Sequence, residues 1–105
     1  MAASLTEQEF SKHLNTNFLV SIPEPVTLEL IEVKPYSSKE LEQGGMERFS
    51  LYFIGPADHY LSQATYSLEH QRMGGFELFL VPVARDERGF QYEAVFNYYK
   101  DQSDG

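Results

Sequence analysis

The segment 76–83 reads Phe-Glu-Leu-Phe-Leu-Val-Pro-Val and is apolar on both faces of an extended chain. Alternate side chains of a strand point to opposite faces. One face here carries Phe76, Leu78 and Leu80, and the other carries Phe79, Val81 and Val83. Such a strand needs cover on both sides, from a barrel interior, a helix or a second chain. The segment 92–99, Tyr-Glu-Ala-Val-Phe-Asn-Tyr-Tyr, follows it closely. Both segments predict architecture rather than activity.

Length and composition indicate the number of domains and the broad class of the protein. The 105 residues are enough for a single domain, 1–105, with a modest core. Hydrophobic residues make up 42% and charged residues 23%, which is ordinary for a soluble globular domain. No apolar run is long enough to span a bilayer, and no signal peptide pattern opens the chain. We therefore expect a soluble, cytoplasmic protein without membrane insertion.

The charge balance is strongly acidic. Eight Lys and Arg residues face 16 Asp and Glu residues, so the formal net charge is −8. Such a surface repels phosphate backbones and anionic lipid headgroups, and the basic residues are scattered rather than clustered. We expect no nucleic-acid binding. The absence of cysteine excludes disulfides, thiol catalysis and thiolate metal ligands, and it fits a reducing compartment.

The pattern of elements is one helix followed by six strands. Thr6 and Glu9 form the signature of a capping box, and Phe10 and Leu14 share a face, so we expect a helix over 6–14. Alternating apolar residues and turn signals predict strands at about 18–22, 26–33, 49–54, 64–70, 76–83 and 90–99. This predicts a mainly β (α+β) fold, in which mostly antiparallel strands form a strongly bent sheet or small barrel. The helix would cover an open end or one face.

Two strands contain irregularities. The apolar register slips near Leu30-Ile31, which predicts a β-bulge or sharp bend. Pro82 lacks an N–H donor inside the most apolar strand. It must therefore lie at a bulge, at an edge position, or where the strand leaves the sheet.

Two segments read as irregular. Residues 34–48 contain Pro35, two serines, a charged stretch and Gly44-Gly45, and they predict a mobile loop or a single helical turn. The polar tail 101–105 is expected to fray.

Catalysis would most plausibly use histidine. Asp58 and His59 lie in the loop before the fourth strand, and His70 ends that strand. A composite site would form if this loop folded over the strand end. Because a histidine at a strand end more often makes a structural hydrogen bond, we favour the structural reading.

The other motifs of enzymes and cofactor sites are missing from the sequence. There is no histidine pair at metal-ligand spacing, no calcium loop, no Gly-rich phosphate loop and no nucleophile elbow. We therefore expect no metal and no cofactor, and we lean against an enzyme.

Aromatic residues give the most suggestive surface signal. Seven Tyr and eight Phe make the chain 14% aromatic. If Ala94, Phe96 and Tyr98 face the core, an outward patch remains on two strands, formed by Tyr52, Ile54, Val95, Asn97 and Tyr99. Such a patch is typical of an interface with a protein partner or a second copy. The alternative is that the N-terminal helix covers it.

Four ordered segments carry a resemblance over nearly the whole chain. They are 49–53 with Gly55-Pro56, 66–70, 77–82 and 92–97. Together they resemble an uncharacterised family of small bacterial proteins, whose members open with a Leu-Thr-x-x-x-Phe helix, here at Leu5, Thr6 and Phe10. The resemblance implies no activity, cofactor or catalytic residue. It implies an accessory or assembly role beside phage-tail-like or tail-collar proteins.

Three functional hypotheses follow. The leading one is a non-enzymatic interaction or assembly module that uses an apolar, tyrosine-bearing sheet face or edge. The second is a small-ligand-binding barrel lined by Phe49, Leu51, Phe53, Tyr66 and Leu68. The third is a small hydrolase or isomerase that uses His59 and His70.

Overall fold

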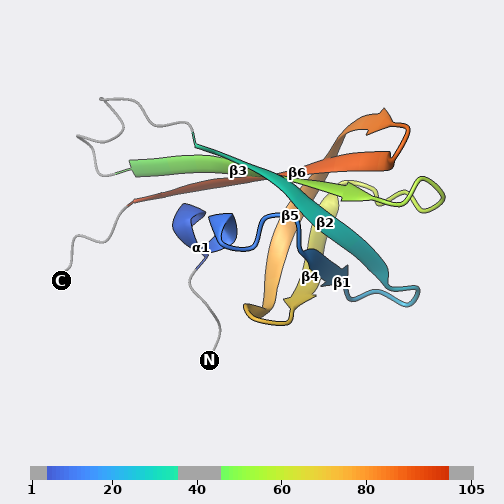
Figure 1. Ribbon diagram of the computed structural model, residues 1–105, viewed down its shortest axis with the longest axis horizontal. Helices are drawn as coiled ribbons and strands as arrows, with labels where there is room; N and C mark the ends of the chain where they lie inside the picture. Colours follow the sequence, from blue (N-terminus) through green and yellow to red (C-terminus); the bar gives the residue numbers. More distant parts are fainter. Residues whose placement is uncertain (1–4, 36–45, 100–105) are drawn as a thin grey trace.

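The computed structural model describes residues 5–35 and 46–99, apart from the side chains of residues 46, 47 and 97–99. Within these ranges one short helix is followed by six strands (Figure 1). In chain order they are α1 (Glu7–Ser11), β1 (Asn17–Val20), β2 (Val26–Pro35), β3 (Met46–Gly55), β4 (Ala64–His70), β5 (Gly74–Asp86) and β6 (Gly89–Tyr99). The expected loop over 34–48 is shorter where it is described, because β2 continues to Pro35 and β3 begins at Met46, and residues 36–45 and the tail 101–105 lie outside the described residues.

The six strands form a closed antiparallel barrel in the order β1-β2-β3-β6-β5-β4. The barrel closes between β1 and β4, where only Leu19 with Glu69 and Val20 with Leu68 are in register. Longer pairings hold the rest of the ring together, above all between β3 and β6. The predicted mainly β fold with an N-terminal helix and a bent, barrel-like sheet is confirmed.

Inward-facing side chains fill the barrel. Its interior is lined by alternate residues of every strand, as a period of two requires. The members with no exposed surface are Phe18, Val20, Leu28, Leu30, Leu51, Phe53, Leu68, Leu80 and Tyr92. A void large enough for a water molecule would give the atoms around it accessible surface. The interior is therefore packed by its own side chains.

Both predicted irregularities are present. The register of β2 against β3 shifts between Leu30 and Glu32, which confirms the bulge expected near Leu30-Ile31. The register of β5 against β6 shifts between Pro82 and Ala84, so Val83 is the extra residue. Of the three placements open to Pro82, the structure shows a bulge. These bulges bend the long strands, as closure of a small barrel requires.

The helix is shorter than the expected span of 6–14. The Thr6 hydroxyl accepts the Glu9 N–H at 3.1 Å, as an N-cap should. After Ser11 the chain makes tight turns in which Lys12 and His13 donate to carbonyls three residues back. Asn15 then adopts a left-handed conformation with φ of 65°, which an asparagine tolerates. Leu14 is consequently carried off the packed face and is 37% exposed.

Phe10 closes one end of the barrel. Its side chain is fully buried, and its ring lies 5.6–6.4 Å, centroid to centroid, from those of Phe18, Phe49, Phe76 and Phe96. Those four rings belong to β1, β3, β5 and β6. In Figure 1, α1 lies in the angle between the β3–β6 arm and the β4–β5 arm. The helix therefore covers the open end, and not the outer face of β5.

The opposite end is closed by the loop 56–63. Leu61 of this loop is buried in the core, and its N–H donates to the Tyr92 hydroxyl at 2.8 Å. Burial raises the pKa of Tyr92. The turn between β5 and β6 packs tightly against the end of β3 at this end of the barrel, because a Cβ on Gly89 would lie 1.9 Å from the Gly55 carbonyl oxygen.

The Phe10→Ala variant tests the role of the helix. Removing this ring leaves a cavity among four aromatic side chains, so the free energy of unfolding should fall by about 3–5 kcal/mol. Leu14→Ala serves as the control, and we expect it to cost less than about 1 kcal/mol because its side chain is partly exposed. Urea unfolding followed by circular dichroism gives both values. Equal losses in the two variants would show that α1 does not close the barrel through Phe10.

Candidate functional site

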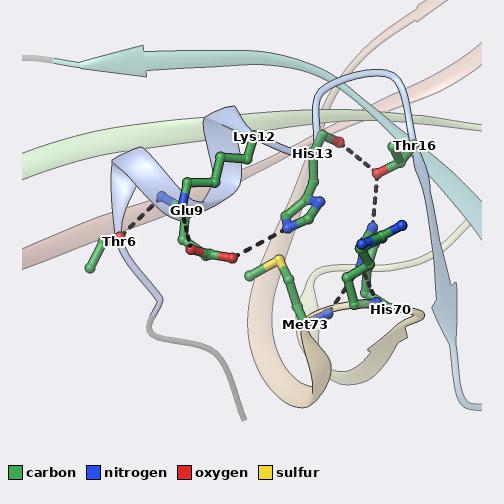
Figure 2. Close-up of polar contacts among 8 residues, drawn as sticks. Thr6, Glu9, Lys12, His13, Thr16, His70 and Met73 are labelled. Carbon is green, nitrogen blue, oxygen red and sulfur yellow. Dashed lines mark hydrogen bonds and ion pairs between the residues drawn. The ribbon is translucent and has the colours of Figure 1, made fainter.

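His70 joins two segments that are distant in the sequence, the end of β4 with the turn after it and the 16–18 segment that leads into β1. It ends β4 and is 8% exposed, and its ring packs against Phe18 with centroids 4.4 Å apart. One ring nitrogen contacts Thr16 in the turn after α1, and the other contacts the turn that leads into β5. Figure 2 shows α1, the 13–16 turn and the 70–73 turn converging on this residue.

The hydrogen bonds determine the tautomer of His70. Nδ1 accepts the N–H of Arg72 at 3.0 Å and the N–H of Met73 at 3.2 Å, so it carries no proton. Nε2 therefore carries the proton of the neutral ring and donates to the Thr16 hydroxyl at 2.9 Å. That hydroxyl in turn donates to the His13 carbonyl oxygen at 2.6 Å. Both nitrogens are used, and the ring has a structural role.

The surroundings of His70 favour its neutral form. Burial lowers the pKa of His70, and the nearby charges of His13 and Arg72 lower it further. Protonation would also place a donor at Nδ1 in front of two N–H donors. A group in this state is a poor general base at neutral pH, because its lone pair is already occupied.

His13 lies beside His70 and is paired with the helix. The two imidazole rings are 4.6 Å apart, centroid to centroid. His13 Nε2 lies 3.3 Å from one oxygen of the Glu9 carboxylate, and Lys12 Nζ lies 3.4 Å from the other. These contacts, led by the hydrogen bond with His13, hold the pKa of Glu9 below its usual value. The Glu9 carboxylate therefore does not complete the reciprocal half of the predicted capping box.

A surface hollow of about 530 Å³ opens over this cluster. It is lined by His13, Thr16, Asn17, His70, Gln71 and Arg72. All of these residues have polar side chains. The best candidate for a general base among them is His70, but its Nδ1 already accepts two backbone N–H groups. Among the residues that the structure describes, no three His, Cys, Asp or Glu side chains are grouped so that they could hold a metal ion.

The proposed partners of His70 lie elsewhere. Asp58 and His59 belong to the loop that precedes β4, and they line a different hollow with Ile54, Pro56 and Arg88. His70 stands at the far end of β4, and a strand of seven residues spans roughly 20 Å. The structure therefore does not bring Asp58 and His59 together with His70.

The five predicted interface residues have different environments. Val95 is 50% exposed, whereas Ile54 is only 7% exposed. Tyr52 is half-buried, and its hydroxyl donates to a Glu93 carboxylate oxygen at 3.2 Å. The Ser50 hydroxyl donates to the same oxygen at 2.6 Å. The side chains of Asn97 and Tyr99 lie outside the described residues.

The structure adds two outward apolar side chains to this surface. Phe79 is 51% exposed and Val83 is 45% exposed, both on β5. Alternation in 76–83 assigns Phe79 and Val83 to the face opposite Leu78. It does not show whether the helix covers that face. The His13–Thr16–His70 cluster has no sequence signal, because its hydrogen bond joins residues 54 positions apart.

Comparison with known protein families assigns the chain to a family. A family model described as a domain of unknown function, DUF6916, matches residues 5–96. The chain belongs to this family. The match runs from the start of the helical segment into β6, so the family domain includes the helix and all six strands. No curated protein and no solved structure is significantly similar to the chain.

Within 5–35 and 46–99, no helix is both long and apolar enough to cross a membrane.

The state of His70 predicts how stability depends on pH. Its pKa is lower in the folded chain than the value of about 6.5 in the unfolded chain, so the unfolded state binds the proton more tightly. The contribution of neutral His70 to the free energy of unfolding should be fully present above pH 6.5. It should decrease as the pH falls from there through the pKa of His70 in the folded chain. In His70→Gln this decrease should shrink. Loss of the Nδ1 acceptor should also cost about 1–3 kcal/mol at pH 8.

Urea unfolding at a series of pH values measures both effects. His59→Gln is the matched control, because it removes a histidine and leaves His70 with all its partners. It should keep the pH dependence of the wild type. The structural assignment of His70 is wrong if His70→Gln unfolds with the wild-type pH profile and the wild-type free energy.

Proposed function

We propose that this domain is a non-enzymatic module that binds another protein through the outer face of β5 and β6. We call this surface the outer β5–β6 face and define it by Phe79, Val83 and Val95. The observation that carries the proposal is the exposure of these three side chains while α1 covers a different part of the barrel. Apolar side chains gathered on one exposed face are typical of a contact with a partner.

The strand register supports the grouping of these residues. Val81 is opposite Glu93, and this is the last matched pair of β5 and β6 on this side of the bulge. Phe79 and Val95 each lie two residues beyond that pair, so both side chains are on the outer face where the two strands begin to separate. Val83 lies at the bulge of the same strand.

The two alternative functions have less support. A ligand inside the barrel would need space that the fully buried Leu51, Phe53 and Leu68 do not leave. A hydrolase or isomerase would need His59 and His70 near one substrate, yet they line separate hollows. The packed interior and the separated histidines therefore favour binding over chemistry.

The class of partner is suggested only by resemblance. The sequence segments that resemble small bacterial proteins imply an accessory or assembly role. On this basis we propose a component of a phage-tail-like or tail-collar assembly as the partner. An acidic chain with net charge −8 would contact such a component through the apolar side chains of this face, and its charge would favour a basic partner.

The Val95→Glu variant tests the proposed surface. A carboxylate at this half-exposed position would have to be desolvated in the complex, so affinity for the partner should fall at least about tenfold, or 1.4 kcal/mol. The partner is first isolated from the native cell with tagged wild-type protein, and binding is then measured with the purified pair. Gln63→Glu adds the same charge in an exposed loop and should bind like the wild type.

Two results would contradict the proposal. One is a partner that binds Val95→Glu as tightly as the wild type. The other is a wild-type protein that is monomeric in solution and recovers no partner from the native cell.

A further inference from the structure

Strand β5 changes its neighbour along its length. From Gly74 to Leu80 it pairs with β4, and from Val81 to Asp86 it pairs with β6. Strand β6 pairs with β3 over nearly its whole length, from Phe90 to Tyr99. The two strands therefore part beyond Val81 and Glu93 and form a fork, which is visible in Figure 1 as the divergence of β5 from β6. Each strand has one edge without a strand partner in this fork, among the described residues.

One hydrogen bond shows which residues face the open edge of β5. The Ser21 N–H donates to the Ser67 carbonyl at 2.8 Å, so the main chain of Ser67 points toward β1 and away from β5. Ser67 is opposite Glu77. In an antiparallel pair, two opposed residues either exchange hydrogen bonds or both point away from each other. The N–H and C=O groups of Glu77 therefore point away from β4, toward the open edge.

Alternation extends this assignment along the strand. No register shift interrupts β4 and β5, so Gly75 and Phe79 point the same way as Glu77. All three residues are exposed. No hydrogen bond from their main chains to another described part of the chain, outside the strand ladders, is present. The helix fills the inner side of the fork through the contacts of Phe10 with Phe76 and Phe96, whose side chains face the barrel interior.

We propose that the open edge of β5, residues 75–79, binds an extended segment of a partner protein as an added strand. This inference rests on the proposed binding function and specifies its mode. Three outward-pointing residues supply main-chain donors and acceptors for the new strand, as in known cases of strand addition. Phe79 supplies an apolar contact at one end of this edge.

Charge determines what kind of segment fits. Glu77 stands in the middle of the edge with its side chain on the outer face, on a chain of net charge −8. A Lys or Arg directly opposite Glu77 would be favourable, and a carboxylate there would be unfavourable. The added strand would therefore carry a basic residue at its centre, apolar residues two positions to either side, and small residues between them on the inner side.

The same carboxylate disfavours the pairing with a second copy of the chain that is centred on Glu77. Two β5 edges that paired antiparallel about a two-fold axis at Glu77 would place both Glu77 side chains opposite each other. The partner that best fits the edge is therefore a basic, extended segment of a different protein.

A capped synthetic peptide, Ser-Val-Thr-Lys-Thr-Val-Ser, tests the inference with the full chain. Paired antiparallel to β5, its symmetric sequence presents lysine opposite Glu77, and the N–H groups of its second, fourth and sixth residues then face β5. Titration followed by nitrogen-15 NMR should show the largest shifts at the amides of Gly75, Glu77 and Phe79. The peptide N-methylated at its second, fourth and sixth amides should bind at least about tenfold more weakly, because those groups face β5.

The matched control peptide is N-methylated at the third and fifth amides, which face away from β5, and it should bind like the parent. A parent peptide with glutamate in place of lysine should bind the wild-type protein more weakly. The same glutamate peptide should bind the Glu77→Lys variant as tightly as the parent peptide binds the wild type. Equal weakening by both methylation patterns, or no binding by the parent peptide, would overturn strand addition. A dimer in which the amides of residues 75–79 become protected would overturn the choice of a different protein as partner.

The two proposals can fail separately. If Val95→Glu loses the natural partner while the peptide does not bind, the domain still binds a protein through its outer face, and only the strand mode is wrong. If Val95→Glu keeps the partner and the parent peptide binds at residues 75–79, the edge is correct and the outer β5–β6 face is not the contact.

Discussion

The enclosure of the Phe10 ring by four other phenylalanine rings is the contact on which the rest of the structure depends. Those rings come from β1, β3, β5 and β6, so one side chain joins both arms of the barrel. A helix of five residues has no independent stability in water. It exists here because Phe10 is buried and because two hydrogen bonds hold the chain after it. Asn15 N–H donates to the Leu30 carbonyl oxygen, and His70 Nε2 donates to the Thr16 hydroxyl.

This arrangement accounts for the division between packed and open surfaces. Because α1 is used to close the end of the barrel, no described element covers the outer β5–β6 face. The separation of β5 from β6 makes room for Phe10 between Phe76 and Phe96, and the same separation leaves the outer edge of β5 without a strand partner. The exposed face and the open edge are therefore two consequences of the same helix position.

Much of the fold could be predicted from the sequence, because alternation is a local property. The strands and the bulge after Leu30 follow from neighbouring residues, whereas Pro82 predicts an irregularity whose kind, a bulge, only the structure shows. The end of the helix at Ser11 could not, since Leu14 fits the apolar pattern and only tertiary contacts draw the chain away. The His70 cluster and the fork could not either, because both depend on which strands become neighbours. The outward patch could be predicted only in part from alternation. Val95 is exposed as expected, whereas Ile54 is buried although alternation predicts that it points outward.

The central claim is that the helix leaves β5 with an open outer edge. Residue-resolved amide hydrogen exchange on the free protein tests it most directly. The account predicts that the amides of Phe76, Leu78 and Leu80, which face β4, exchange slowly, and that those of Gly75, Glu77 and Phe79 exchange fast. Strong protection of all six amides in the free protein would contradict it, because the edge would then already be paired.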